Sequence, residues 1–297
     1  DGQLTEAGAL FGRLPWVDRT QGGFAMATRL LLLTAALLSL TSAAFAQDRD
    51  DLAKAAQNPV AAMISLPFQN NTLFGVGPDD DVANVLNIQP VIPFTIGDWN
   101  LINRTIAPVI YLPDITSGLP ELPEGVGSGS EFGLGDINHS VYFSPVDSGP
   151  IIWGVGPSIT IPTATDKKLG TEKWSAGPAA VALAQPGPWV IGSLVRQLWS
   201  FAGDGDRKDV SQLLIQPFVN YNMEDGWYLV SSPIITANWE ADSDNRWTVP
   251  IGGGFGKIFK IGNQPMNAQL QGFYNVEHPR FGPNWSLRFQ LQFLFPK

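Results

Sequence analysis

Strand-like runs joined by alternately short and long connections are the feature of this sequence that most constrains its fold. From residue 61 onward we count twelve such runs, and none has the 3.6-residue period of an amphipathic helix. Gly, Pro, Asn and Asp, which favour turns, bound the runs. The runs cover residues 61–71, 82–97, 99–114, 132–147, 150–165, 173–185, 189–203, 209–223, 227–241, 246–262, 264–279 and 285–295.

The connections fall into two length classes that alternate along the chain. Five are turns of two or three residues, from Gly97-Asp98 to Gly262-Asn263, and the others are mostly longer and acidic, such as Asn71–Asp81, Asp114–Glu131 and Asp204–Lys208. Outer-membrane barrels have short periplasmic turns and longer extracellular loops. A soluble sandwich has no reason to separate its loops by length. We therefore predict an all-β fold, a transmembrane antiparallel up-and-down β-barrel of about twelve strands, with both termini on the short-turn side.

Within the runs, apolar and polar side chains alternate. The last run places Leu and Phe at the odd positions of 287–295 and Arg288, Gln290 and Gln292 between them. Successive strand residues face opposite sides of a sheet, so each run has one apolar and one polar face. A soluble sandwich would alternate in the same way, so the prediction of a membrane barrel rests on the loop lengths. Prolines inside the runs predict either bulges or misplaced run boundaries at Pro90, Pro93, Pro108, Pro157, Pro178, Pro217 and Pro233.

Composition agrees with a membrane barrel and excludes several function classes. Charged residues make up 15% of the chain, below the roughly 25% of ordinary soluble domains. The chain has no cysteine, which excludes disulfides and thiolate chemistry. Its net charge of −9 argues against nucleic acid as a partner, because phosphate binding needs a basic surface.

The N-terminal region predicts export. Met26–Ala46 combines a short basic start, an apolar core at Leu30–Leu40 and the small-x-small sequence Ala44-Phe45-Ala46, which together are typical of a secretory signal peptide cleaved between Ala46 and Gln47. We interpret residues 1–25 as a mis-called upstream extension. Residues 26–46 are then the signal peptide, 47–60 a periplasmic lead segment and 61–297 the barrel, located in the outer membrane of a Gram-negative cell.

Tryptophans cluster near the ends of the runs. One set follows the short turns and another lies near the long loops, as expected for the two aromatic girdles at the membrane interfaces. The predicted girdle residues are Trp99, Trp189 and Trp227 at the short-turn side, and Trp174, Trp199, Trp239, Trp247 and Trp285 at the long-loop side.

Nine short segments of the chain are distinctive in sequence. They are Asn58–Asn70, Gly75–Pro78, Asn87–Pro90, Gly135–Asn138, Lys173–Pro178, Gln185–Trp189, Gln216–Tyr221, Asn238–Ala241 and Gln292–Lys297. Together the segments resemble Gram-negative outer-membrane barrels related to the phenol-degradation MetA-pathway family, some of which carry the misnomer "neuromedin U". The resemblance implies an outer-membrane barrel that passes small or hydrophobic molecules, and it supplies no catalytic residues.

The polar face is the candidate functional surface. An interior of amides with few charges predicts a channel or uptake barrel for small solutes, hydrophobic or neutral, whose partners are the lipid bilayer, the outer-membrane assembly machinery and the solute. A closed structural barrel without transport is the alternative. The predicted lumen-lining residues are Gln212, Gln216, Asn220, Gln269, Gln271, Glu277, Arg288, Gln290 and Gln292.

Catalysis and metal binding have weak support. His139 and His278 are the chain's two histidines, and the adjacent His139 and Ser140 point to opposite faces of a strand, so they cannot pair with each other. An outer-membrane acyl hydrolase stays a further alternative. The acidic clusters Asp79–Asp81 and Asp204–Asp209 lack the spacing of a calcium-binding loop. We predict no enzyme activity, no cofactor and no metal.

Overall fold

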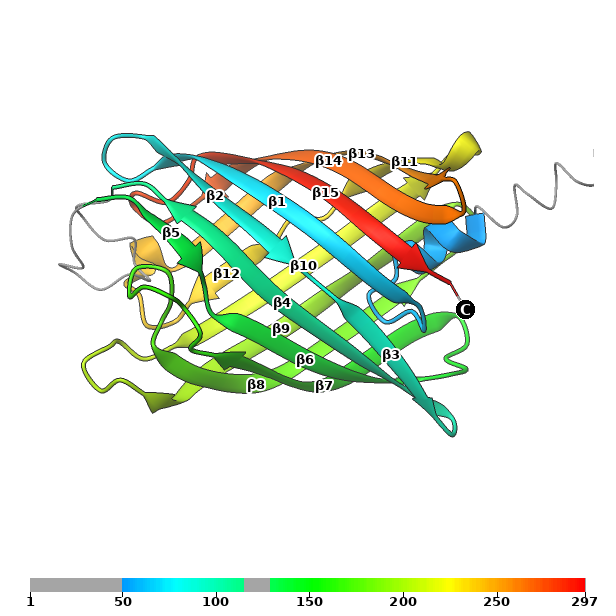
Figure 1. Ribbon diagram of the computed structural model, residues 1–297, viewed down its shortest axis with the longest axis horizontal. Coiled ribbons are helices and arrows are strands. Elements are labelled where there is room, and N and C mark those ends of the chain that lie inside the picture. Colours follow the sequence, from blue (N-terminus) through cyan, green and yellow to red (C-terminus); the bar gives the residue numbers. More distant parts are fainter. Residues whose placement is uncertain (1–49, 115–128, 297) are drawn as a thin grey trace, which may run out of the picture. The chain divides into compact units, whose positions relative to one another are not determined.

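The computed structural model describes residues 50–114 and 129–296, so the predicted signal peptide, its cleavage site and the upstream extension lie outside the described residues. Fifteen strand segments form one sheet that closes on itself (Figure 1). Three strands are interrupted and contribute two segments each, namely β2/β3, β5/β6 and β11/β12. The fold is therefore a closed barrel of twelve antiparallel strands, as the sequence predicts.

The strands follow one another around the ring in chain order, and β1 pairs with β15 to close it. Their bounds are β1 (Ile64–Val76), β2 (Asp81–Ile88), β3 (Val91–Ile96), β4 (Trp99–Leu112), β5 (Glu131–Leu134), β6 (Ile137–Pro145), β7 (Ile151–Ile161), β8 (Lys173–Ala184), β9 (Trp189–Gly203), β10 (Ser211–Asn222), β11 (Trp227–Ser231), β12 (Ile235–Asn238), β13 (Trp247–Ile261), β14 (Gln264–Glu277) and β15 (Trp285–Phe295).

A short helix over residues 50–56 precedes the barrel, and 3-10 turns occur at Glu224–Gly226 and Ser243–Asn245. No helix in the described part of the chain is long and apolar enough to cross a membrane.

The predicted strand-like run 61–71 ends too early. The run was expected to stop at residue 71, but β1 continues to Val76, so its connection to β2 spans only residues 77–80. The polar residues here are satisfied within the strand pair: Asn70 Nδ2 donates to Asn84 Oδ1 at 2.7 Å, and Asn84 Nδ2 donates to Thr72 Oγ1 at 3.1 Å. Hydrogen bonds between amide and hydroxyl side chains on paired strands stabilise the sheet here. The polar composition of this part of the chain alone does not predict a strand.

The two ends of the barrel differ as expected. Turns such as Gly97-Asp98 and Gly262-Asn263 are tight, and both glycines have positive φ (58° and 59°), which a two-residue hairpin requires. The described loops at the other end include 162–172, 204–210, 239–246 and 278–284.

The prolines disturb the ladder in two ways. Pro90 and Pro233 lie in the β2/β3 and β11/β12 interruptions, where no strand hydrogen bond is needed from their nitrogen. The other five lie inside strands, and Pro157 and Pro178 face each other across β7 and β8. The register shifts of the sheet lie elsewhere, at Phe74/Val76, Trp174/Ser175 and Val249/Pro250. The expected bulges are therefore wrong at the five in-strand prolines, whereas misplaced boundaries, the alternative, are confirmed at Pro90 and Pro233.

Candidate functional site: the lumen of the barrel

The N-terminal segment fills the short-turn end of the barrel. Val60 belongs to a buried cluster with Ile102, Tyr142 and Val190, which are inward-facing residues of β4, β6 and β9. Ala53 belongs to another cluster with the inward residues of β11, β13 and β15. These clusters lie on different parts of the ring, so residues 53–60 span the interior. Hydrogen bonds from Gln57 Nε2 to Asn222 Oδ1 (2.8 Å) and from Gln185 Nε2 to the Lys54 carbonyl (3.0 Å) attach the segment to the wall.

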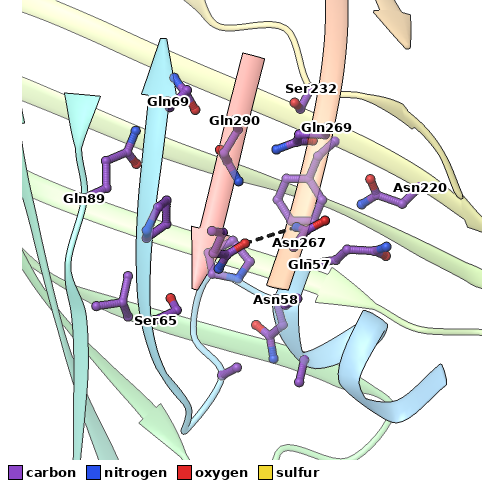
Figure 2. Close-up of a pocket in the computed structure, with 18 of the residues that line it drawn as sticks. Gln57, Asn58, Ser65, Gln69, Gln89, Asn220, Ser232, Asn267, Gln269 and Gln290 are labelled. Atoms are coloured by element: carbon purple, nitrogen blue, oxygen red, sulfur yellow. Dashed lines mark hydrogen bonds between the residues drawn. The ribbon is translucent and has the colours of Figure 1, made fainter. Parts of the chain in front are cut away.

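An amide-lined cavity of about 150 Å³ lies between this segment and the barrel wall (Figure 2). Gln57 and Asn58 of the N-terminal segment line this cavity together with amides from the strands, among them Gln69, Gln269 and Gln290 (Figure 2). Gln269 and Gln290 are direct cross-strand partners of β14 and β15. We call this space the lower cavity.

A larger cavity of about 510 Å³ lies toward the long-loop end, and we call it the upper cavity. Most of its wall is aliphatic and comes from inward-facing residues of several strands and of loop 162–172, a composition typical of small-molecule sites. The aliphatic and proline residues are Leu73, Val76, Ala83, Val85, Ile106, Pro108, Ile110, Leu112, Leu169, Leu194, Leu198, Leu214, Ile234 and Pro283.

The two cavities are neighbours in the lumen, because five residues line both. The shared residues are Gln69, Gln89, Arg104, Leu194 and Gln216. A solute moving from the loops toward the short turns would pass an apolar chamber, then a polar junction, then an amide-lined chamber closed by the N-terminal segment.

Interior arginines are held by neutral acceptors. Arg104 Nη2 donates to Gln89 Oε1 (2.8 Å), and Arg196 Nη1 donates to Asn138 Oδ1. Arg288 Nε donates to Asn71 Oδ1 (2.9 Å), and its Nη1 donates to the Ser232 carbonyl (2.8 Å). The ion pairs found in the described part of the chain, Lys173–Asp209 and Arg207–Glu172, involve none of the three.

The long-loop end is narrowed by loop 162–172, which Asp136 anchors. Asp136 lies in the β5/β6 interruption, and its carboxylate accepts hydrogen bonds from Thr171 N (2.7 Å), Thr171 Oγ1 (2.8 Å) and Ala164 N (3.2 Å). Leu169 of this loop is buried against Val76, Ala83 and Leu112. The loop therefore folds inward and forms one wall of the upper cavity.

The predicted lumen residues occupy three kinds of position. Gln212 lines the upper cavity, Gln216 both cavities, and Asn220, Gln269, Gln290 and Gln292 the lower cavity. Gln271 and Arg288 are buried and bonded to Ser232. Glu277 is exposed at the end of β14 and lines neither cavity.

Sequence reasoning missed the aliphatic wall and two of the arginines. Strand β4 is apolar on both faces, with Ile106 and Ile110 inside and Val109 and Tyr111 outside, so it has no two-residue period to reveal a lumen face. The sequence could have identified Arg104 and Arg196 as lumen residues from their charge. A charge in the middle of a membrane strand is costly toward lipid and therefore belongs in the lumen.

Outward-facing tryptophans lie at both ends of the strands. Seven of the eight predicted girdle residues are among the exposed large apolar side chains, and Trp247 is partly covered. At the long-loop end, Trp285 stacks on Phe74 (ring centroids 3.8 Å apart) and Trp239 contacts Trp247 edge-on. At the short-turn end, Trp99 contacts Trp153 edge-on.

His139 and Ser140 lie on opposite faces of β6. Ser140 Oγ is buried and donates to Ser158 Oγ (2.8 Å), whereas the His139 ring meets Thr105 Oγ1 at 3.0 Å on the outer face. Within residues 50–114 and 129–296, no third group is hydrogen-bonded to the His139 ring, and no cluster of His, Asp or Glu could hold a metal ion. A nucleophile–base–orienter set is therefore not assembled there.

Comparison with known proteins identifies the fold. No protein-family model and no curated protein sequence matches this chain. An outer membrane channel from Pseudomonas putida F1 has a similar structure, with a TM-score of 0.59 and 18% identity over 80% of this chain and 97% of that one. This chain has the fold of an outer-membrane β-barrel.

Two other solved structures overlap less well. They are the β domain of a Bordetella autotransporter (TM-score 0.43, 11% identity, 79% of this chain and 100% of that one) and outer membrane phospholipase A from Escherichia coli (0.40, 11%, 80% and 91%). Both scores are too low to support an inference.

Proposed function

We propose that this protein is an outer-membrane channel or uptake barrel for small hydrophobic solutes. The observation that carries the proposal is the upper cavity, about 510 Å³ in volume and mostly aliphatic, inside a closed barrel. Its volume lies within the roughly 300–1,000 Å³ of typical ligand sites. The structural neighbour from Pseudomonas putida, an outer membrane channel, is consistent with this function.

In the proposed path, a solute enters between the long loops and leaves toward the periplasm. The upper cavity would desolvate the solute, and the amides of the lower cavity would exchange hydrogen bonds with water as it leaves. Residues 53–60 fill the exit in this structure, so release requires that they move. If they never move, the protein is a closed structural barrel, which is the second candidate.

The remaining parts of the proposal concern location and partners. We propose that a signal peptide at residues 26–46 exports the chain, that residues 1–25 are not part of the exported protein, and that assembly machinery inserts the barrel. The exposed tryptophans would lie at the two membrane interfaces. We also propose kinship with the MetA-pathway group, on the segments that resemble it.

Uptake by intact cells tests the transport proposal. Ala83 faces the upper cavity and is 2% exposed, whereas its neighbour Val82 faces outward and is 42% exposed. Cells that make the wild-type protein should take up radiolabelled ethylbenzene faster than cells that lack it. Ala83→Trp should abolish this gain because the indole fills the cavity, and Val82→Trp should preserve it. Equal uptake by wild-type and Ala83→Trp cells would contradict the proposal.

A further inference from the structure

Two cationic side chains share the upper cavity without a carboxylate partner. Arg104 projects from β4 and Arg196 from β9, and both line the cavity. Each donates one hydrogen bond to an amide oxygen, of Gln89 and Asn138 respectively. Most N–H groups of each guanidinium therefore have no acceptor in the described part of the chain.

The fold makes specific room for Arg196. Strands β7 and β8 separate β9 from β6, and at this level they turn only small residues inward, Ser158, Gly177 and Ala179. The Arg196 side chain can therefore cross both strands to Asn138. Asn138 is fixed in turn, because its Nδ2 donates to Ser158 Oγ (3.1 Å) and Thr160 Oγ1 (3.0 Å).

The other charged groups of the cavity do not neutralise the arginines. Asp136 is the one carboxylate among its described lining residues, and Thr171 and Ala164 of loop 162–172 occupy its oxygens. The described lining residues therefore place two arginines against one carboxylate, which loop 162–172 already binds, although the whole chain carries −9.

Positive charge in an aliphatic chamber is costly unless an anion arrives with the ligand. A guanidinium is a planar fork that matches a carboxylate through two parallel hydrogen bonds. Inorganic anions would satisfy the arginines but would leave the aliphatic wall unused. A ligand with an apolar body and one carboxylate would use both.

We propose that the upper cavity is a binding site for organic monocarboxylates with an apolar body, whose carboxylate is held by Arg104 and Arg196. This inference deepens the proposed uptake function by naming the class of solute. The aliphatic residues of β2, β4 and β10, such as Val85, Ile110 and Leu214, would contact the apolar body.

Calorimetric titration of the detergent-solubilised protein at neutral pH tests the inference with two probes, 4-butylbenzoate and the neutral 4-butylbenzamide. Wild-type protein should bind the acid at least about 10-fold more tightly. Arg104→Gln and Arg196→Gln should each weaken binding of the acid by roughly 10- to 100-fold, as expected for the loss of a charged hydrogen bond, and should leave amide binding unchanged. Arg196→Lys should keep part of the preference, because it keeps the charge but loses the fork.

The control is Arg280→Gln, which removes the same charge from an exposed position in the loop before β15. It should bind both probes like the wild type. Heat-modifiable migration on gels shows that each variant is folded. Equal affinity for acid and amide in the wild type, or an equal loss in Arg280→Gln, would overturn the carboxylate site but not the apolar uptake site. Binding of neither probe would overturn both.

Discussion

Residues 53–60 are expected to control the opening of the channel, and Val60→Asp is the sharpest perturbation of that segment. Val60 is 3% exposed and packs among inward residues of the barrel wall. Full burial of a valine side chain contributes about 1.5–3 kcal/mol, and an unpaired carboxylate at the same place adds a further penalty. We therefore expect the docked state of the segment to lose about 3 kcal/mol, which raises the ratio of undocked to docked protein by roughly 100-fold.

Single-channel recording in planar bilayers measures this effect. The wild type should open rarely, whereas Val60→Asp should open often, with discrete conductance steps. Ala62→Asp is the matched control, because Ala62 lies two residues beyond Val60, outside the segment, and is exposed, so it should tolerate the charge. If folded Val60→Asp opens no more often than the wild type, or if Ala62→Asp opens equally often, the segment does not close the channel.

Two further predictions concern the loops and the packing of the barrel. Asp136→Ala removes three hydrogen bonds to loop 162–172 and should destabilise that loop locally by about 2–4 kcal/mol. Amide hydrogen exchange should become faster at Thr171 and Ala164 but not in the short turns. Unchanged exchange would show that the carboxylate does not anchor the loop. Gly256→Ala places a Cβ 2.2 Å from Tyr228 Cζ and should lower the stability of the barrel by about 1–3 kcal/mol, measured as a lower midpoint of the heat-induced gel shift. Gly272→Ala is the control and should have little effect, because a Cβ there meets no atom within 4 Å. Equal midpoints for the two variants would show that the tight contact with Tyr228 does not limit stability.

The barrel could be predicted from the sequence because its determinants are local. Alternation in β15 assigns Phe289 to the lipid face and Arg288 to the interior from their neighbours alone, and turns such as Gly262-Asn263 mark where strands reverse. The pairing of β14 with β15 then follows, with Gln269 opposite Gln290.

The arrangement of the lumen could not be predicted, because it depends on contacts between distant residues. Gln57 and Asn222 are 165 positions apart, and nothing in the local sequence of residues 50–60 shows that they fill the barrel. The aliphatic wall was also hidden, because Ile106 and Ile110 have the composition expected of residues that face lipid. Only the closed ring determines which face of β4 points inward.

The position of a bound solute tests the central claim most directly. Crystals of the protein soaked with bromobenzene and measured at the bromine absorption edge would locate the solute by anomalous scattering. We predict a bromine site inside the barrel, in the upper cavity between Leu73, Ile110 and Leu214, and its loss in Ala83→Trp. Bromine found only on the outward, lipid-facing surface would contradict the proposal that the lumen takes up hydrophobic solutes.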